Sequence, residues 1–378
     1  MKIRSNLKNW KLMARVIISG GGTGGHVFPA IAIADALKSL RPDLDILFVG
    51  AEGKIEMEKV PKAGYKIVGL NIAGFQRKLT FKNLLFPFKL AASMIKAINI
   101  VRSFKPDVAV GVGGYASGPV LKIANTFGIP TVLQEQNSFA GVTNRILAAK
   151  AALICVAYDG MERFFPKQKI LFTGNPVRKD ILDNIKKQNE ALETLGLDQN
   201  KKTLLIFGGS LGARTINEAI RSNAESLMSM EDINIIWQVG KIYCDEYKTC
   251  VLASRPNVKI LPFIENMDIA YSAADVVICR AGALTVSELA VLGKASILIP
   301  SPNVAEDHQT VNAMSLVSRD AAVLVKDNEA KEMLISEVNR LLYDDYKLKS
   351  LRENIKYFGR PQAAIKIAEE ILKLCKNA

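Results

Sequence analysis

The sequence predicts an α/β protein made of two Rossmann-like, doubly wound parallel-sheet domains that face one cleft. Two glycine-rich turns of the same type, at residues 20–25 and 208–213, lie one in each half of the chain. Each follows a short apolar run typical of a buried parallel strand and precedes a segment with helical periodicity. The length of 378 residues also exceeds what a single hydrophobic core usually holds. Two domains of the same kind are therefore expected.

Strand and helix patterns alternate through the whole chain, as a doubly wound fold requires. In the first half, strands are predicted at 16–18, 45–49, 107–111, 130–133 and 152–156, with helices at 29–40 and 144–149. In the second half, strands are predicted at 204–207, 234–239, 258–261, 275–279, 295–299 and 322–325.

The turn residues 174–176, Gly-Asn-Pro, come just before a charged helical stretch and mark the domain boundary. We therefore predict a first domain over residues 1–177 and a second domain over residues 178–360. The last helix, within 361–378, follows a Gly-Arg-Pro break and is expected to pack back on the first domain.

The composition indicates a cytoplasmic globular protein with an anionic partner. Its five cysteines are scattered and include no Cys-x-x-Cys pair, so neither a disulfide framework nor a zinc site is expected. No run of about 18 apolar residues occurs, and the charged N-terminus lacks the apolar core of a signal peptide. A net charge of +13 suits nucleic acid, an anionic membrane or an anionic substrate, and a generally lysine-rich surface with no such partner is the alternative. Nucleic acid is disfavoured, because the sequence has no nucleic-acid-binding signature and only two tryptophans.

One basic and aromatic segment, residues 74–105, favours an anionic membrane surface as a partner. It contains no acidic residue, and a segment of this kind can lie in the headgroup region of a bilayer. Within it, residues 94–101 are expected to form a core-facing helix with a solvated basic side. Membrane docking is predicted for Phe75, Arg77, Lys78, Phe81, Lys82, Leu85, Phe86, Phe88 and Lys89.

The first glycine turn satisfies the Gly-x-Gly-x-x-Gly spacing of dinucleotide-binding folds, so an NAD-dependent dehydrogenase is one alternative. That fingerprint expects an acidic residue at the end of the second strand, and here none occurs before Glu52. The second half of the chain also lacks an obvious hydride-transfer site.

Two histidines and one glutamate are the best candidates for chemistry. His26 and His308 are the only histidines, and each follows the predicted carboxyl end of a strand, where doubly wound sheets bind ligands. Glu288 lies in the first turns of a helix that follows a strand and a small-residue turn. A carboxylate at that point can accept hydrogen bonds from both hydroxyls of a ribose.

Seven motifs stand in the order found in one known family, at 20–26, 113–119, 134–137, 173–178, 208–213, 280–288 and 307–309. On these motifs the chain resembles the MurG family over almost its whole length. These enzymes are the UDP-N-acetylglucosamine:undecaprenyl-diphospho-muramoylpentapeptide N-acetylglucosaminyltransferases of bacterial peptidoglycan synthesis. The resemblance implies an inverting GT-B glycosyltransferase with the lipid-linked muramoylpentapeptide on the first domain and UDP-GlcNAc on the second. It also implies no cofactor and a peripheral place on the cytoplasmic face of the inner membrane.

The resemblance assigns roles to individual residues. Glu288 resembles the ribose ligand, and the backbone of Ile264 resembles the uracil contact. Arg178 and Ser210 resemble contacts to the donor diphosphate. Leu211 departs from the family pattern, because many relatives have glutamine there, which puts a side-chain contact from this position in doubt. Gln309 resembles a contact to the sugar. The residues that would close over the donor from the first domain are Thr23, Gly24, Gly25 and Asn137. The residues that would surround the nucleotide together with Glu288 are Ala283, Leu284, Thr285, Val286 and Ser287.

Inverting transfer needs a base for the acceptor's proton and a group that stabilises departing UDP. His26 is predicted as that base or as an acceptor-orienting group, because a near-neutral pKa suits proton transfer. The helix N-terminus after the second glycine turn, aided by Arg178, would stabilise UDP, and no cluster of paired aspartates indicates a metal. A UDP-sugar epimerase of related fold would use the same nucleotide site and stays open beside the dehydrogenase.

Overall fold

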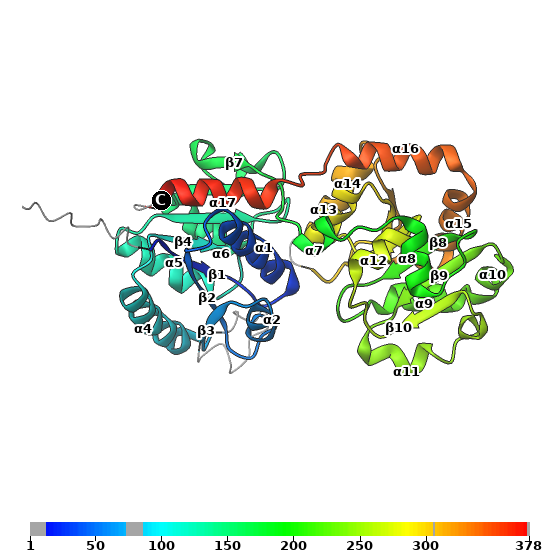
Figure 1. Cartoon of the computed structure of the whole chain (residues 1–378), viewed down its shortest axis with the longest axis horizontal. Coiled ribbons are helices and arrows are strands. Elements are labelled where there is room, and N and C mark those ends of the chain that lie inside the picture. The colour runs from blue at the N-terminus through cyan, green and yellow to red at the C-terminus, as the bar shows by residue number, and fades with distance from the viewer. Residues whose placement is uncertain (1–12, 73–85, 305–306, 376–378) are drawn as a thin grey trace, which may run out of the picture.

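The computed structural model, which describes residues 13–72, 86–304 and 307–375, has two α/β lobes, each built on one parallel sheet (Figure 1). The N-terminal sheet has seven strands in the order β3-β2-β1-β4-β5-β6-β7. They are β1 (Arg15–Ser19), β2 (Asp45–Ala51), β3 (Lys66–Leu70), β4 (Val108–Gly111), β5 (Thr131–Glu135), β6 (Leu153–Val156) and β7 (Ile170–Phe172).

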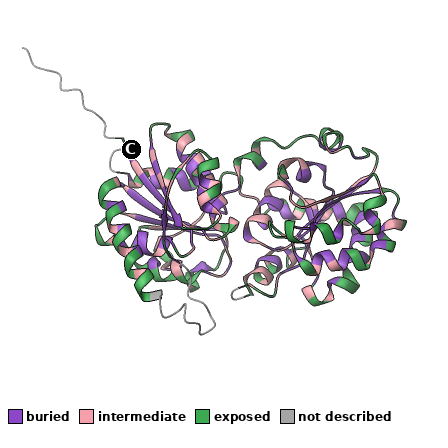
Figure 2. Cartoon of the chain, turned by 90° about the horizontal axis from the view of Figure 1, so that it is seen from below, coloured by how far each residue is buried: buried purple, intermediate pink, exposed green. Residues whose placement is uncertain are grey.

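Helices cover both faces of this sheet, so its central strands are buried (Figure 2). Successive strand residues point to opposite faces, and Val16 and Ile18 accordingly pack in one core while Ile17 packs in the other. This is why the strands appear in the sequence as continuous apolar runs. The helices are α1 (Gly24–Leu40), α2 (Glu56–Lys62), α4 (Phe86–Phe104), α5 (Ser117–Thr126) and α6 (Val142–Leu147).

The C-terminal lobe repeats the plan with six parallel strands in the order β10-β9-β8-β11-β12-β13. They are β8 (Lys202–Phe207), β9 (Ile233–Gln238), β10 (Val258–Leu261), β11 (Val276–Cys279), β12 (Ala295–Leu298) and β13 (Val323–Leu324). The helices are α7 (Lys179–Asp183), α8 (Gln188–Leu195), α9 (Arg214–Ser222), α10 (Ala224–Ser229), α11 (Cys244–Tyr247), α12 (Met267–Ala273), α13 (Ala283–Leu292), α14 (His308–Val317), α15 (Ala330–Tyr343) and α16 (Asp345–Lys356).

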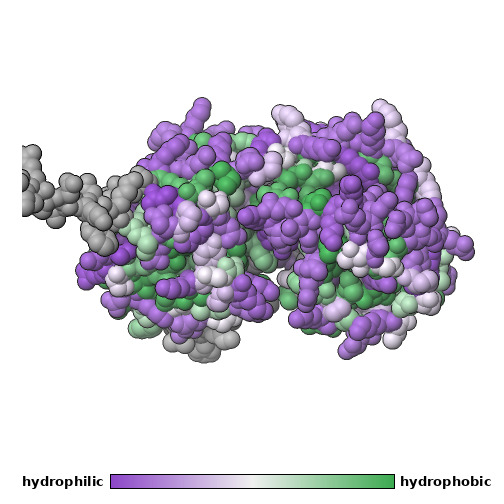
Figure 3. All heavy atoms as spheres, viewed as in Figure 1, coloured by the Kyte–Doolittle hydropathy of each residue, from purple (hydrophilic) through white to green (hydrophobic). Residues whose placement is uncertain are grey.

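The chain passes between the lobes twice, first after β7 and again after α16 (Figure 1). The second passage leads into α17 (Ala363–Leu374), which lies against α1 and buries Ile367 and Ile371 in the core of the N-terminal lobe. A notch separates the two lobes beside their contact region (Figure 3). The proposed boundaries of the two domains, 1–177 and 178–360, stay predictions.

The predicted fold class, two doubly wound parallel sheets, is confirmed, and each strand expected from the sequence overlaps an observed one. The strands β3 and β7 were not predicted. They form the two edges of the N-terminal sheet, where burial is incomplete. A strand that is only partly buried does not need the continuous apolar run that identifies the central strands.

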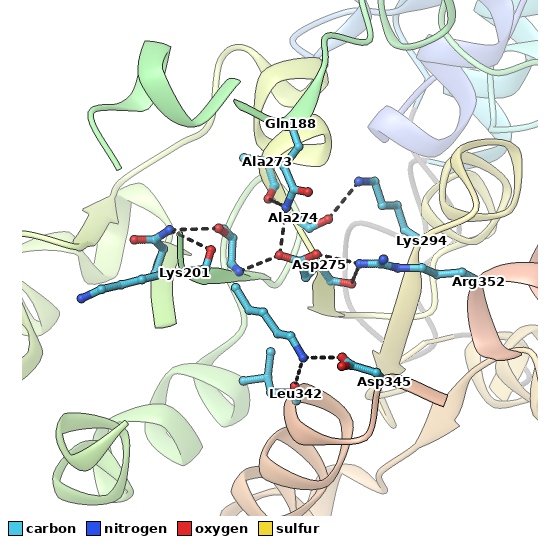
Figure 4. A network of polar contacts seen from close by, with 12 residues as sticks. Gln188, Lys201, Ala273, Ala274, Asp275, Lys294, Leu342, Asp345 and Arg352 are labelled. Carbon is cyan, nitrogen blue, oxygen red and sulfur yellow. Dashed lines mark hydrogen bonds and ion pairs between the residues drawn. The ribbon is translucent and has the colours of Figure 1, made fainter. Parts of the chain in front are cut away.

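A polar cluster joins helices to the amino-terminal side of the C-terminal sheet (Figure 4). Asp275, just before β11, is its centre: Oδ1 accepts a hydrogen bond from Arg352 of α16 at 2.8 Å. Oδ2 accepts hydrogen bonds from the side chain of Gln188 and from the amide of Thr203, both at 2.9 Å. The buried carboxylate is therefore fully hydrogen-bonded. Since ligands of such sheets bind at the opposite, carboxyl ends of the strands, this cluster serves the fold.

Lys294 lies beside this cluster and donates a hydrogen bond to the carbonyl of Ala274 at 2.9 Å (Figure 4). Burial, and then the nearby guanidinium of Arg352, lower the pKa of Lys294 from 10.5 to about 8. An unfolded lysine keeps the higher pKa, so the folded state loses stability as the pH falls from 10.5 towards 8. The substitution Lys294→Met should therefore raise the free energy of unfolding at neutral pH, by on the order of 1–3 kcal/mol.

Chemical denaturation at several pH values between about 7 and about 10 measures this effect. The stability gain of Lys294→Met over the parent should shrink as the pH rises. Lys326→Met, at an exposed lysine, is the control and should show no such trend. A gain that is independent of pH would contradict the assignment.

Candidate active site

Both glycine-rich turns lie where the strand order of their sheet reverses. The first turn follows β1, which pairs with β2 on one side and β4 on the other; the second follows β8, which lies between β9 and β11. The chain leaves such neighbouring strands towards opposite faces, which opens a crevice with uncovered backbone amides. The two crevices are the natural places for ligands in this fold.

The buried carboxylate of Glu56 fixes the first glycine turn by hydrogen bonds, and the sequence did not indicate this role. Glu56 opens α2 and is 1% exposed; its Oε2 accepts from the amide of Gly22 and its Oε1 from the amide of Ala51, both at 2.9 Å. A Cβ at Gly21 would lie 2.1 Å from Glu56 Oε1, so glycine is required there. In the sequence, Glu56 stands among alternating charges that are typical of a solvated surface, and nothing marks it as special.

His26 lies in the first turn of α1, with its ring against the turn that follows β4. Its Nδ1 is 3.1 Å from the carbonyl oxygen of Gly21, and because a carbonyl can only accept, Nδ1 carries the proton. This leaves Nε2 as the nitrogen that can accept a proton. Gly113, with φ of +93°, packs so closely on the ring that a Cβ would lie 2.9 Å from Nε2. Burial lowers the pKa of His26, and the hydrogen bond to Gly21 and the charge of Glu56 oppose this only in part.

Asn137 follows β5 on a loop that a second buried carboxylate fixes. Oε1 of Glu135 accepts from the amide of Asn137 at 3.1 Å, and Oε2 accepts from the amide of Gly141 at 3.0 Å and the side chain of Asn144 at 2.9 Å. Burial raises the pKa of Glu135, and these hydrogen bonds oppose the rise. Asn137 is half-buried, and the neighbouring Ser138 donates a hydrogen bond to Asn312 of the other lobe.

A cavity of about 290 Å³ opens beside the second glycine turn. Helices α9 and α13 begin at its wall, so the free amides of two helix N-termini lie there. Arg280 adds a cation, which carbonyl oxygens of Ile299 and Pro300 and an ion pair with Asp327 hold in place. These features suit a diphosphate. The cavity is lined by Phe207, Gly208, Gly209, Gly212, Ala213, Arg280, Gly282, Thr285, Ser301 and Gln309.

A larger cavity of about 600 Å³ lies between α1, α7 and α17, where the chain passes between the lobes. Its lining includes none of the predicted site residues, and it lies away from the carboxyl ends of the strands. The smaller cavity is therefore the candidate site.

Glu288, on α13, is held by a tyrosine and an arginine. Its Oε2 accepts a hydrogen bond from Tyr271 at 3.0 Å, and its Oε1 is 3.6 Å from Nε of Arg178. Burial raises the pKa of Glu288, and the charge of Arg178 opposes this. Among the described residues, Nε of Arg178 has no hydrogen-bond partner, and the guanidinium lies 5.1 Å from the ring of Phe28 on α1. Arg178 thus stands between the lobes beside the candidate ribose ligand.

Two further predicted site residues, Ile264 and Gln309, already make hydrogen bonds within the protein. The amide of Ile264 donates to Oε1 of Gln238 at 3.0 Å, and Nε2 of Gln238 donates to the carbonyl of Gly209 at 2.7 Å. A uracil contact at Ile264 would therefore use its carbonyl oxygen. Oε1 of Gln309 accepts from the amide of Ser301 at 2.8 Å, which directs this side chain to the wall of the smaller cavity.

The other predicted residues differ in how far they can reach a ligand. Ala283 and Val286 are buried in the core, so only their backbones are available, and the Leu211 side chain is 74% exposed. Exposed or half-buried positions are Thr23, Gly24, Gly25, Ser210, Leu284, Thr285 and Ser287. Phe86 opens α4, and Phe88 and Lys89 are exposed on it. The predicted docking residues that lie outside the described ranges are Phe75, Arg77, Lys78, Phe81, Lys82 and Leu85.

Across residues 13–72, 86–304 and 307–375, no helix is long and apolar enough to cross a membrane. The same residues contain no group of three His, Cys, Asp or Glu side chains that could hold a metal ion.

Family models match both lobes: the glycosyltransferase family 28 N-terminal domain over residues 16–156, and the family's C-terminal domain over residues 203–367. A UDP-N-acetylglucosamine--N-acetylmuramyl-(pentapeptide) pyrophosphoryl-undecaprenol N-acetylglucosamine transferase of Bacteroides fragilis is 54% identical over 366 residues, covering 96% of each chain. The crystal structure of Acinetobacter baumannii MurG superposes with a TM-score of 0.75 at 31% identity, covering 95% of this chain and 99% of that one.

Fold and site together define a two-domain glycosyltransferase of the GT-B type. The chain belongs to glycosyltransferase family 28 and, within it, to the MurG family. A UDP-GlcNAc 2-epimerase of Neisseria meningitidis, solved with UDP-GlcNAc bound, also superposes, with a TM-score of 0.68 at 15% identity, covering 96% of this chain and all of the other. That likeness shows a shared fold only.

The carboxylate under the first glycine turn gives a test of this geometry. In Glu56→Gln, the amide NH2 group would face a backbone N–H that Glu56 now accepts from, at a cost of about 1–3 kcal/mol. We expect transferase turnover to fall about 5-fold to 100-fold while UDP affinity, which we expect the other lobe to provide, stays unchanged. Steady-state kinetics and calorimetry measure the two effects. Glu58→Gln, on the exposed side of the same helix, is the matched control, and equal turnover in the two variants would contradict the role.

Proposed function

We propose that this chain transfers N-acetylglucosamine from UDP-N-acetylglucosamine to undecaprenyl-diphospho-muramoylpentapeptide, with inversion at the sugar, in peptidoglycan synthesis. The observation that carries the proposal is the match over 96% of the chain to a relative whose name states this transfer. The cavity beside the second glycine turn, which Thr285 of the same helix as Glu288 lines, supports it. A dehydrogenase is disfavoured, because Glu56 already occupies the Gly22 amide in the turn that would bind NAD.

On the donor side, we assign the ribose hydroxyls to Glu288, whose Oε1 accepts no hydrogen bond from the described residues and lies 3.6 Å from Nε of Arg178. The diphosphate would lie in the cavity of the second glycine turn, near Ser210 and the amides that open α9 and α13, with Arg178 and Arg280 as cations. Fixed positive potential of this kind stabilises the charge that develops on departing UDP. Gln309 would contact the sugar, the carbonyl of Ile264 the uracil, and residues 283–287 would cradle the nucleotide.

On the acceptor side, His26 is assigned as the base or as the group that orients the acceptor. Its Nδ1 is committed to the carbonyl of Gly21, which leaves Nε2 to take the proton of the attacking hydroxyl. Its lowered pKa keeps the imidazole neutral at pH 7, as a base must be. Thr23, Gly24, Gly25 and Asn137 would close over the donor from this lobe.

The acceptor's lipid requires the enzyme to work at a bilayer, and we propose peripheral docking on the cytoplasmic face through residues 75–89. Phe88 and Ile95 on α4 are 74% and 62% exposed, and Val142 and Ile146 on α6 are 68% and 74% exposed. Helix α5 contacts both α4 and α6. Apolar side chains with basic neighbours such as Lys89 favour an anionic membrane surface.

The direct test is product formation from radiolabelled UDP-GlcNAc and lipid-linked muramoylpentapeptide. The parent chain should form a lipid-linked disaccharide, and Glu288→Ala should weaken UDP binding by about 1.5–3 kcal/mol, because a charged hydrogen-bond acceptor is lost. Calorimetry measures the affinity, with Glu190→Ala, at an exposed position on α8, as control. N-acetylmannosamine in the product fraction would instead support the epimerase, and unchanged UDP affinity would remove Glu288 from the site.

His26→Ala should lower kcat about 100-fold to 10,000-fold with little change in UDP affinity. Because burial lowers the pKa of His26, the acid limb of the parent's kcat profile should lie below pH 6.5, the ordinary histidine value. Single-turnover assays with a short soluble acceptor measure both effects. Near-normal turnover of the variant would reject the catalytic role.

Reversal of charge at Lys78, Lys82 and Lys89 should reduce binding to anionic vesicles and slow turnover on a vesicle-embedded acceptor. Turnover on a water-soluble acceptor should be unaffected. The electrostatic part should weaken as salt shortens the Debye length, which is about 8 Å at physiological ionic strength. Reversal at the exposed lysines 326, 331 and 349 of the C-terminal lobe is the control. Equal cosedimentation of both triple variants would place the docking surface elsewhere.

A further inference from the structure

A buried side-chain amide joins the loop after β5 to the helix that carries Glu288. Asn175, in the first passage between the lobes, is 2% exposed. Its Nδ2 donates to the carbonyl of Gln136 and to Oγ of Ser287, both at 3.0 Å. Its Oδ1 accepts from the side chain of Gln134 at 3.0 Å. One amide thus links two residues of the N-terminal lobe to α13 of the C-terminal lobe.

A second buried amide makes a parallel link. Asn312 lies on α14 and is completely buried. Its Oδ1 accepts from Oγ of Ser138 at 2.9 Å and from the amide of Ser138 at 3.3 Å. Its Nδ2 donates to the carbonyl of Ala281, two residues before α13 begins, at 3.2 Å. Asn175 and Asn312, with the groups that they bond, form what we call the amide junction.

The amide junction encloses two residues with proposed roles on the substrate. Asn137 stands between Gln136 and Ser138, the two points where the loop is bonded to the junction. Glu288 follows Ser287, the point where α13 is bonded. The junction therefore fixes the loop of one lobe against the nucleotide helix of the other, across the cleft where transfer would take place.

The side chains of Asn175 and Asn312 are placed to fix other protein groups in position and not to contact a substrate. Both are buried, and neither lines the cavity beside the second glycine turn. Each amide donates on one side and accepts on the other. An isosteric aspartate would turn an acceptor towards a carbonyl oxygen and lose the donors, so the junction depends on the amide group itself.

We propose that Asn175 and Asn312 are positioning residues for the transfer: they set Asn137 and the acceptor lobe in register with the donor on α13 and contact neither substrate. This inference rests on the proposed function. Misplacement of reacting groups by about 1 Å can cost about 100-fold in rate. Loss of the junction should therefore lower kcat while the nucleotide, held by the C-terminal lobe alone, still binds.

The test compares Asn175→Asp and Asn312→Asp with the parent for kcat, KM for UDP-GlcNAc, UDP affinity by calorimetry and thermal midpoint. The matched control is Asn234→Asp, a completely buried amide at the amino-terminal part of β9 that bonds Asp198 and Thr203 within the C-terminal lobe. Both junction variants should lose about 10-fold to 100-fold in kcat and keep UDP affinity within about twofold. The control should lose thermal stability but keep its kcat.

Three results would overturn the inference: kcat of a junction variant within about twofold of the parent, an equal loss in Asn234→Asp, or UDP affinity that falls in parallel with kcat. If the aspartate variants do not fold, Ser138→Ala decides, since it removes only one hydroxyl from the junction. Its kcat should fall about 3-fold to 10-fold, and an unchanged kcat would overturn the inference. A parent chain that forms no disaccharide would refute the proposed function and the inference with it, whereas an active parent with active variants refutes the inference alone.

Discussion

The reversal of strand order beside β1 and beside β8 is the constraint on which the candidate site depends. Because the segments after neighbouring strands leave towards opposite faces, backbone amides stay uncovered at the carboxyl end of each sheet. The side chains of Asn175 and Asn312 bring these two ends together, because each bonds both the loop after β5 and α13 or the residues just before it. The return of α17 to α1 ties the lobes a second time. The strand topology thus creates the cleft, and the side chains determine which ligands it can bind.

The two glycine turns resemble each other in sequence but differ in chemistry. The Gly22 amide of the first turn is occupied by the buried carboxylate of Glu56, whereas the second turn borders a cavity with two helix N-termini and Arg280. A diphosphate is therefore better accommodated at the second turn. The first turn instead holds His26, whose Nδ1 is fixed by the carbonyl of Gly21. In the proposed transfer, the C-terminal lobe would supply positive potential for departing UDP, and the N-terminal lobe would supply a neutral imidazole as base.

The sequence identified what depends on strongly periodic or unusual local patterns. Central strands, both glycine turns and the fold class could be predicted because buried parallel strands are continuous apolar runs and glycine marks the tight turns. The edge strands β3 and β7 could not, because they are partly exposed. Glu56, Tyr271 and Asn312 were missed for another reason: their partners are far away in sequence, and only the folded chain shows that they are buried. Asn175 was seen as a turn residue, whereas its side chain bonds across the lobes.

We propose that UDP-GlcNAc binds to the C-terminal lobe with its ribose on Glu288 and its diphosphate over the second glycine turn. A crystal structure of the complex with UDP-GlcNAc tests it most directly. We expect ribose hydroxyls within hydrogen-bonding distance of Glu288 Oε1, phosphate oxygens near the amides of residues 209–213, and the sugar directed towards Gln309 and the His26 side of the cleft. A nucleotide bound instead at the turn of residues 20–25 would contradict this binding mode.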